Sequence, residues 1–350
     1  MKWISDRGLQ SLLEVTRDPD FGGTKYCVLS EISHGGMGTV YRAHDTELNR
    51  QVAIKVLNAT EASGDIAQRM VREAQIIARL EHPGIVPVHD VGLLSDGRVF
   101  YAMKLARGGR LDEYASNNAS MKDRLRKFQA VCEAVAFAHV HGVIHRDLKP
   151  ANIMIGSFGE VLVLDWGVAK LISPAESSPD ASEADTLFQS DANGQNPYDE
   201  QSEHTAPGTI IGTPNYMSPE QARGEIDGLN ERSDVYSLGA ILYFLLTNKS
   251  PRLQPGSTAP ARPRELNSKV TKTAEAVCLK AMAPLPGDRY SSARELVADI
   301  SHLIDDEPVK AYKENAVEIT GRFLSKNRFL VLLVVAYLLM RIFFIFTPRR

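Results

Sequence analysis

Apolar residues along the chain follow two different spacings, and the change between them divides the sequence into two parts. Up to residue 104, short runs of alternating apolar and polar residues, rich in β-branched side chains, predict the strands of a small antiparallel sheet. These runs are YCVLSEI, TVYRA, QVAIKVL, IVPVHDVG and RVFYAMK. After Gly108 the apolar residues recur mainly at helical spacing. One helix is expected in the first part, over 65–80, and the helices expected in the second part cover 121–141, 234–247, 273–282 and 292–304.

This pattern predicts an α+β fold and sets the expected domain organisation. We expect an N-terminal extension over 1–24, with a short helical pattern around Leu9, and one folded domain over 25–305. Within that domain, a sheet-rich small lobe (25–106) precedes a helical large lobe (107–305). Short strand-like pieces, VIHRD, IMI and VLVLD, lie in the middle of the chain.

One segment inside the large lobe differs in composition from its surroundings. Residues 173–207 are rich in Ser, Asp, Glu, Ala and Pro, and they contain no Lys or Arg. Such a segment cannot bury enough apolar surface to offset the entropy that it loses on ordering. We therefore expect an acidic, mobile insertion.

The end of the chain carries an almost uninterrupted apolar run. Residues 329–346 read FLVLLVVAYLLMRIFFIF, with Arg341 as the one charged residue. At about 1.5 Å per residue, such a helix spans most of a hydrocarbon core that is roughly 30 Å thick. It also lacks the amphipathic stripe of a helix that packs on a protein surface. We therefore expect a transmembrane helix over 329–346, between a linker (306–328) and a short tail (347–350). The alternative is a helix that docks on the protein's own body or on a partner.

The charges on either side of this run predict its orientation. More basic residues precede the run than follow it: Lys310, Lys313, Arg322, Lys326 and Arg328 against Arg349 and Arg350. By the positive-inside rule, the folded domain then lies in the cytoplasm, held at the cell membrane by a single pass through the lipid bilayer. The first residues, MKWISDRGLQ, contain no apolar core of a secretory signal.

Composition narrows the range of functions. The formal net charge is -3 and no strongly basic face is indicated, so we expect no nucleic-acid partner. Cys27, Cys132 and Cys278 lie far apart and in no metal-ligand spacing. This arrangement indicates isolated, reduced thiols.

A glycine-rich turn between the first two predicted strands is the first candidate for chemistry. In HGGMG at 34–38, glycines let backbone N–H groups approach phosphates without an intervening Cβ. Lys55 ends VAIK on the next predicted strand, at the spacing of a lysine that reaches those phosphates. Glu73 lies on or beside the apolar face of the 65–80 helix, where a partner such as Lys55 would offset the cost of burial. The alternatives are a structural hairpin turn, a surface lysine and an exposed glutamate.

The most specific signal is HRDLKPAN at 145–152, followed by DWG at 165–167. Phosphoryl transfer requires a carboxylate that orients the attacking hydroxyl and accepts its proton. It also requires oxygen ligands for Mg²⁺ and cations that stabilise developing negative charge. The residues that provide this set are Asp147, Asn152, Asp165 and Lys149.

Taken in order, these motifs give the chain a family resemblance. It resembles a eukaryotic-type Ser/Thr protein kinase, close to the membrane-anchored bacterial branch of that superfamily, over about residues 25–305. The resemblance implies the bilobal protein-kinase fold, ATP and Mg²⁺ as cofactors, and protein substrates. The further motifs that carry it are GTPNY at 212–216, SPE at 218–220, DVYSLG at 234–239 and GDRY at 287–290.

The resemblance implies roles for the matched catalytic residues. Asp147 would be the catalytic base, with Lys149 near the transferred phosphoryl group and the Thr213 hydroxyl in contact with Asp147. Asn152 and Asp165 would ligate Mg²⁺. Lys149 and Thr213 also resemble the Ser/Thr subclass and not the tyrosine subclass.

A nucleotide site is implied in the same way. Lys55 would hold the α- and β-phosphates and pair with Glu73. Met103 would be the gatekeeper before a hinge that binds adenine, and apolar side chains from both lobes would enclose the purine. The implied ATP-binding residues are Ile32, Ser33, His34, Gly35, Gly36, Met37, Gly38, Thr39, Val40, Ala53, Lys55, Glu73, Met103, Lys104, Ala106 and Met154.

Structural and regulatory roles follow as well. Glu220 and Arg289 would form a buried pair in the large lobe, and Asp234 would support the catalytic-loop backbone. Arg146, directly before the catalytic aspartate, would bind a phosphate on the activation loop. The candidate phosphosites are Thr205 and Thr209, modified by autophosphorylation in trans within a transient dimer. As an alternative, carboxylates of the acidic insertion would satisfy the arginine.

The chain departs from the family pattern at three places. Ser33 replaces the first glycine of the glycine loop, Trp166 replaces the usual phenylalanine, and the segment between Asp165 and Glu220 is longer than usual. Because of Ser33 and Trp166, the alternative to an active enzyme is a membrane-tethered pseudokinase that acts as a scaffold.

Overall fold

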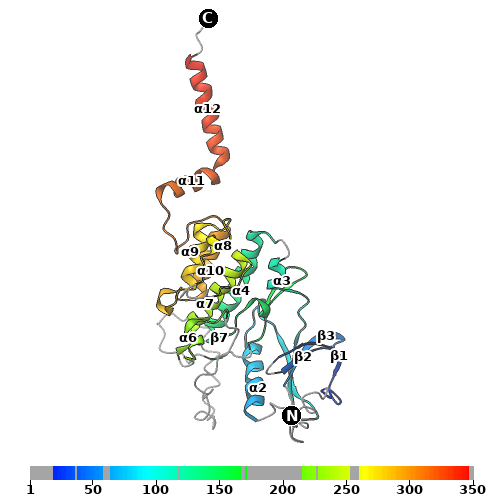
Figure 1. Cartoon of the computed structure of the whole chain (residues 1–350). Helices are drawn as coiled ribbons and strands as arrows, with labels where there is room; N and C mark the ends of the chain where they lie inside the picture. The colour runs from blue at the N-terminus through cyan, green and yellow to red at the C-terminus, as the bar shows by residue number, and fades with distance from the viewer. Residues whose placement is uncertain are drawn as a thin grey trace, which may run out of the picture.

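Strands and helices separate into two lobes, as the change in apolar spacing predicts. Figure 1 shows the strands of the small lobe at one end of the molecule and the helices of the large lobe beside them. The computed structural model describes residues 19–35, 38–57, 64–116, 119–166, 170–171, 215–225, 228–252 and 260–346. The helical pattern around Leu9 and the acidic insertion at 173–207 lie outside these residues.

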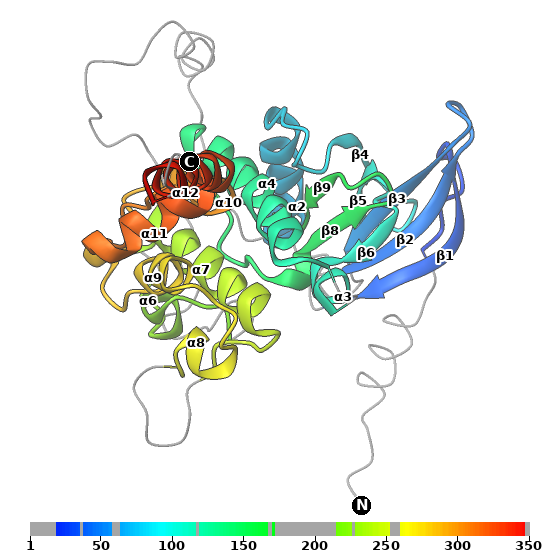
Figure 2. The ribbon, with the colours of Figure 1, turned by 90° about the horizontal axis from the view of Figure 1, so that it is seen from above.

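The small lobe is built on a five-stranded antiparallel sheet with the order β1-β2-β3-β5-β4. Its strands are β1 (Tyr26–His34), β2 (Gly38–Asp45), β3 (Arg50–Leu57), β4 (Val88–Leu93) and β5 (Val99–Lys104). Helix α2 (Gly64–Arg79) packs against β4 and β5. Figure 2 shows α2 between this sheet and the helices of the large lobe.

Alternation along β5 distributes its side chains between two hydrophobic clusters. Val99 and Tyr101 pack with Met70 and Ala74 of α2, together with the partly buried Met103. The intervening side chains, Phe100 and Ala102, pack into the cluster on the opposite face of the sheet. Because successive side chains of a strand point to opposite faces, this register directs Tyr101 and Met103 toward α2.

The expected strand IVPVHDVG is shorter in the structure. Pairing with β5 begins at Val88, after Pro87, which has no N–H to donate to a ladder. The Pro87 carbonyl instead accepts a hydrogen bond from Lys104 N at 3.0 Å. Ile85 forms an isolated bridge with Val163 of the large lobe, so this part of the predicted strand connects the lobes.

The large lobe packs its longer helices around one apolar core. These helices are α4 (Met121–Val140), α7 (Glu231–Thr247), α9 (Lys272–Ala281) and α10 (Ala293–Ile304). Polar caps fix where they begin, because each cap side chain accepts a hydrogen bond from a free N–H of the first turn. The caps are Ser120, Asn230, Thr271 and Ser292. Shorter helices are α3 (Leu111–Ser116), α6 (Pro219–Ala222) and α8 (Pro263–Leu266), with 3-10 turns η2 (Pro150–Asn152) and η5 (Pro286–Asp288).

Small strands next to the junction of the lobes flank the segments that are expected to provide the catalytic and metal-binding residues. A three-stranded sheet joins β6 (Gly108–Arg110), β8 (Ile153–Gly156) and β9 (Val161–Val163), and β7 (Val143–Ile144) pairs with β10 (Lys170–Leu171). The predicted strand VIHRD therefore ends after Ile144, and His145 begins a loop. The described part of the DWG motif, Asp165 and Trp166, follows β9 after Leu164.

Two helices follow the large lobe. Helix α11 (Ala316–Lys326) lies within the predicted linker, and α12 (Arg328–Phe346) covers the apolar run and extends away from the body (Figure 1). Of the helices within the described residues, none combines the length and apolarity that a membrane crossing needs, so the expected transmembrane helix over 329–346 is not confirmed. Many apolar side chains of α12 are exposed, including Phe329 (72%), Leu333 (69%) and Met340 (51%).

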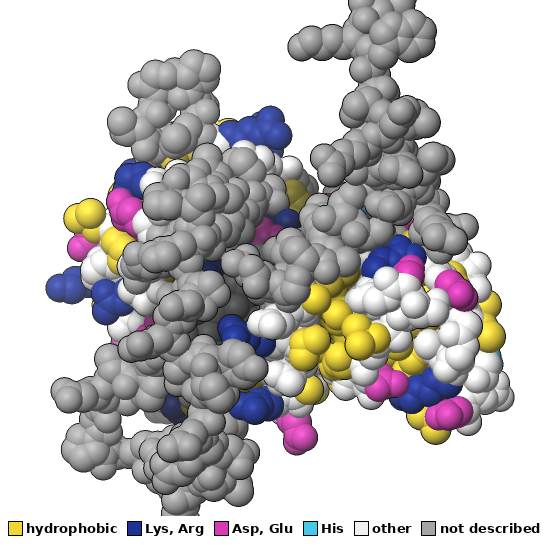
Figure 3. All heavy atoms as spheres, turned by 90° about the horizontal axis from the view of Figure 1, so that it is seen from below, with side chains coloured by type: hydrophobic (Ala, Val, Ile, Leu, Met, Phe, Trp, Pro, Cys, Tyr) yellow, Lys and Arg dark blue, Asp and Glu magenta, His cyan; other side chains and the backbone are white. Residues whose placement is uncertain are grey.

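Charged side chains of both signs are interspersed on the face opposite α12. Figure 3 shows this face, where described Lys and Arg side chains alternate with Asp and Glu around a group of hydrophobic side chains.

Candidate active site

Lys55 connects three elements at the junction of the lobes. From β3, its Nζ donates to Glu73 Oε1 on α2 at 3.2 Å and to Asp165 Oδ1, just after β9, at 3.1 Å. Lys55 and Glu73 are buried. Burial by itself lowers the pKa of Lys55, but the carboxylates of Glu73 and Asp165 raise this pKa overall. A buried cation therefore holds α2 and the DWG segment together.

Asp165 presents an ionised, half-exposed carboxylate at the junction of the lobes. Half of its side-chain surface (50%) is exposed. Burial raises the pKa of this carboxyl, but the charge and hydrogen bond of Lys55 outweigh burial and hold the pKa below its ordinary value. The backbone of Asp165 is left-handed, with φ 62°. Strained residues of this kind concentrate at functional sites.

The Asp147 carboxylate is held from two directions. Lys149 Nζ donates to Asp147 Oδ2 at 2.6 Å. Asn152 Nδ2 donates to the same oxygen at 3.2 Å and to the Asp147 carbonyl at 2.9 Å. Hydrogen bonds thus join three residues that the sequence predicts to lie in one site: Lys149, Asp147 and Asn152.

The buried Asp234 shapes the loop that carries Asp147. Its Oδ2 accepts from His145 N at 2.7 Å, and its Oδ1 accepts from Arg146 N at 2.9 Å. His139 Nε2 lies 2.8 Å from Oδ2. Burial raises the pKa of Asp234, but the contact with His139 and the neighbouring loop lower it overall. These bonds support Arg146 in a left-handed conformation, with φ 68°.

The donor set fits a divalent metal ion. The two bonds from Asn152 Nδ2 to Asp147 leave its amide oxygen for a metal, and Asp165 offers a half-exposed carboxylate. Leu164 N donates to Asn152 O at 2.8 Å, which brings Asn152 close to Asp165. Amide and carboxylate oxygens are ligands that Mg²⁺ accepts, with water and phosphate oxygens completing its shell. No group of three or more His, Cys, Asp or Glu that would hold a metal by itself occurs in the described part of the chain.

Trp166 is fully buried behind the DWG segment. Its indole Nε1 donates to Val163 O at 3.3 Å, and its ring lies 4.6 Å from the ring of His145. His145 Nε2 donates to Leu164 O at 3.0 Å. The tryptophan therefore packs between β9 and the loop that begins at His145, and its presence leaves the Lys55–Asp165 pair intact.

The described part of the glycine loop approaches β3 closely. A Cβ added to Gly38 would lie 2.4 Å from Val56 O, so the close strand contact requires glycine. Gly35 N donates to Gly38 O at 3.0 Å, and His34 Nδ1 lies 2.8 Å from Thr39 Oγ1.

Strand register shows where several residues expected to enclose the purine lie in the small lobe. Ala53 on β3 lies directly opposite Met103 on β5, and Val40 on β2 lies opposite Lys55. Met154 comes from β8 of the large lobe, so it approaches from the other side of the junction. The remaining described residues of the set lie near the end of β1 and at or just after the end of β5: Ile32, Ser33, Lys104 and Ala106. The residues Gly36, Met37, Thr205, Thr209 and Thr213 lie outside the described part of the chain.

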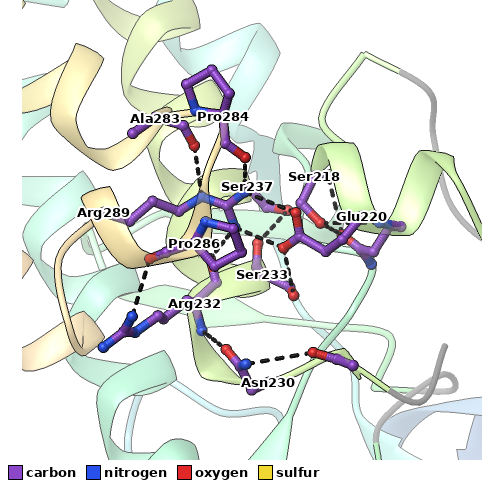
Figure 4. A network of polar contacts seen from close by, with 12 residues as sticks. Ser218, Glu220, Asn230, Arg232, Ser233, Ser237, Ala283, Pro284, Pro286 and Arg289 are labelled. Carbon is purple, nitrogen blue, oxygen red and sulfur yellow. Dashed lines mark hydrogen bonds and ion pairs between the residues drawn. The ribbon is translucent and has the colours of Figure 1, made fainter. Parts of the chain in front are cut away.

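A buried ion pair supports the large lobe below the catalytic loop. Arg289 donates through Nη1 to Glu220 Oε1 at 2.7 Å and through Nη2 to Oε2 at 2.8 Å. Figure 4 shows the surrounding network, in which the Ser233 hydroxyl donates to Glu220 Oε1 at 2.9 Å. The guanidinium also donates to the carbonyls of Ala283 and Pro284. The pair is fully satisfied, as buried charges need to be.

Three residues that contact the expected site residues or their supports were not predicted from the sequence. Tyr101 donates from its hydroxyl to Glu73 Oε1 at 2.9 Å, His139 contacts Asp234, and Gln221 Nε2 donates to Arg146 O at 2.7 Å. The polar tip of a tyrosine within the apolar RVFYAMK run was the available signal for Tyr101, because a buried phenol needs a partner. No local pattern pointed to His139 or Gln221, whose partners are distant in sequence.

Comparison with known proteins agrees with this geometry. The family model of the protein kinase domain matches residues 26–306. Serine/threonine-protein kinase PknD of Chlamydia trachomatis is 35% identical over 316 residues, covering 81% of this chain and 32% of that protein. Serine/threonine-protein kinase PknB of Mycobacterium leprae is 36% identical over 297 residues, covering 81% of this chain and 43% of that protein.

The chain thus spans about a third of the length of PknD and less than half that of PknB. Among solved structures, the kinase domain of Mycobacterium tuberculosis PknI is similar in fold, with a TM-score of 0.57 at 23% identity over 79% of this chain and 96% of that one. On the family match and the two relatives, the chain belongs to the protein kinase family.

Proposed function

We propose that the chain is a protein kinase that transfers the γ-phosphoryl group of ATP to serine and threonine hydroxyls of protein substrates. The observation that carries the proposal is that two side-chain networks lie close together at the lobe interface. One network holds Asp147 between Lys149 and Asn152, and the other joins Lys55 to Glu73 and Asp165. Both are needed to place a nucleotide and an acceptor in line.

Each residue then has a chemical task. The Asp147 carboxylate accepts a hydrogen bond from the substrate hydroxyl, orients it toward the γ-phosphorus and takes its proton. Lys149, 2.6 Å from that carboxylate, would stabilise the negative charge that develops on the transferred group. Lys55 holds the nucleotide phosphates while Glu73 fixes its position.

Asn152 and Asp165 would hold the metal, and we propose Mg²⁺ because both offer hard oxygen ligands. When bound, the ion neutralises phosphate charge in the transition state.

Serine and threonine are the proposed acceptors, and catalysis is preferred to a scaffold role. PknD and PknB are named serine/threonine-protein kinases, and Lys149 of this chain resembles that subclass. The pseudokinase alternative depended on Ser33 and Trp166. No observation favours it, since Trp166 is accommodated without loss of the Lys55–Asp165 pair.

We extend the proposal to the end of the chain. Exposed apolar side chains on α12, such as Leu333 and Leu339, would favour contact with a lipid bilayer, because apolar surface in water is costly. The proposal is that this helix attaches the kinase to the cell membrane, with the kinase domain on the cytoplasmic side.

Regulation by autophosphorylation is part of the same proposal. Thr205 and Thr209 precede the GTPNY motif, and a phosphate on either would supply acceptor oxygens for Arg146. Modification in trans would involve a transient dimer.

The test of the activity is phosphoamino-acid analysis. Purified protein is incubated with Mg-ATP and a basic protein that contains serine, threonine and tyrosine. We expect phosphoserine and phosphothreonine but no phosphotyrosine. Phosphotyrosine as the main product, or no phosphoprotein at all, would contradict the proposal.

A further inference from the structure

Glu73 has a second partner besides Lys55. The Tyr101 hydroxyl donates to Glu73 Oε1 at 2.9 Å, and Lys55 Nζ donates to the same oxygen at 3.2 Å. Tyr101 and Glu73 are 2% and 7% exposed, so this bond is shielded from water. A hydrogen bond to a buried charge contributes more than one at the surface.

Tyr101 reaches Glu73 through a stiffer side chain than Lys55 does. It lies on β5, directly opposite Lys55 on β3 and Val91 on β4, so strands flank it on both sides. Its ring packs in the cluster that includes Met70 and Ala74 of α2. The phenol has two side-chain torsions, whereas the lysine reaches Glu73 through a flexible stem. The geometry therefore presents a pre-oriented donor to the helix.

The two donors to Glu73 differ in what else they must do. Lys55 is shared with Asp165 at 3.1 Å, and in a working kinase it also serves the nucleotide phosphates. The Tyr101 hydroxyl has a single proton to donate, and that proton goes to Glu73. Burial raises the pKa of this phenol, so it stays protonated as a donor.

We propose that Tyr101 is a positioning residue that holds α2 in its active place through Glu73, independently of Lys55. The inference rests on the proposed kinase activity, because it assigns Tyr101 a part in that reaction. Because the Tyr101 hydroxyl bonds to Glu73, Glu73 keeps a partner when Lys55 turns toward phosphate or Asp165. The active arrangement of α2 is then a property of the small lobe itself.

The test is Tyr101→Phe, which removes one oxygen and keeps the ring and its packing. We expect kcat to fall about 10-fold, the size of a lost hydrogen bond to a charged group, with little change in the KM for the protein substrate. In nucleotide-free protein, backbone amides of α2 should exchange hydrogen faster than in wild type. The matched control is Tyr243→Phe, because the buried Tyr243 donates to Ala261 O at 2.8 Å in the large lobe. That variant should keep wild-type kcat and α2 exchange.

A double-mutant cycle separates positioning from simple packing. In a Glu73→Gln background, Tyr101→Phe should change kcat far less than in wild type, because the two residues act through one bond. Unchanged kcat and unchanged α2 exchange in Tyr101→Phe would overturn the proposal, as would fully additive effects in the cycle. The exchange measurement needs no phosphotransfer, so it decides the role of Tyr101 even if the proposed activity fails.

Discussion

Lys55 Nζ lies 3.1 Å from Asp165 Oδ1, so the lysine of β3 is already joined to the expected metal ligand. The ion pair links a strand of the small lobe to the segment after β9 in the large lobe. It keeps the cation expected to bind phosphates next to the carboxylate expected to bind the metal. On the proposed function, loss of either side chain would weaken both nucleotide binding and charge stabilisation.

Lys55→Met and Asp165→Ala should each lower phosphotransfer by about 100-fold or more, because each removes charge that stabilises the transition state. Initial rates with a generic protein substrate and Mg-ATP measure the effect. Lys269→Met is a suitable control, since Lys269 is exposed on the large lobe. Wild-type turnover in either active-site variant would exclude the assigned roles.

Glu220→Gln should destabilise the protein by about 3 kcal/mol at neutral pH, because it leaves the buried Arg289 guanidinium without its counter-charge. Urea unfolding measures the difference. In the exposed Arg223–Glu225 pair, Glu225→Gln should leave the unfolding free energy nearly unchanged.

The same pair predicts a pH dependence. Burial raises the pKa of Glu220, but the hydrogen bond from Arg289 outweighs it, and the pKa lies below the ordinary 4.5. The unfolded chain therefore binds the proton more readily than the folded one. The stabilisation is fully present above about pH 4.5 and is lost as the pH falls through the folded-state pKa. The gap between wild type and Glu220→Gln should narrow on acidification, and a constant gap from pH 7 to pH 3 would argue against the ion pair.

The sequence predicted the order and type of most main elements, because apolar spacing and polar caps act locally. β3, α4 and α10 lie within a few residues of their expected bounds. It also named Lys55, Glu73, Asp147 and Asp165, which occur in motifs of fixed spacing.

What it did not predict depends on contacts between distant segments. Tyr101 meets Glu73 across 28 positions, and His139 meets Asp234 across 95. No local sequence pattern predicts contacts between residues that are so far apart in the chain. The expected strand from Ile85 failed for a related reason, since Ile85 pairs with Val163 of the other lobe.

Thr205→Ala/Thr209→Ala should reduce the activity of protein preincubated with Mg-ATP, since both candidate acceptors for a phosphate that binds Arg146 are then absent. Intact-mass and peptide analysis before and after incubation identifies the sites in wild type. Full activity of the double variant would point instead to carboxylates of the acidic 173–207 segment as partners of Arg146.

A truncated chain that ends at Asn327 lacks α12 and should leave the membrane fraction, because the exposed apolar side chains are then removed. Carbonate extraction and fractionation of both lengths measure this. Truncated protein that stays with membranes, or full-length protein released by carbonate, would rule out attachment through α12.

Phosphorylation of the purified protein and of an added protein substrate by γ-labelled Mg-ATP, with wild type compared with Asp147→Asn, tests the central claim most directly. The variant keeps the size of the side chain and replaces the carboxylate that Lys149 and Asn152 hold. We expect labelled serine and threonine in wild type and a loss of about 100-fold or more in the variant, since the base is removed. Equal labelling by the two proteins, or no labelling by wild type, would contradict the account.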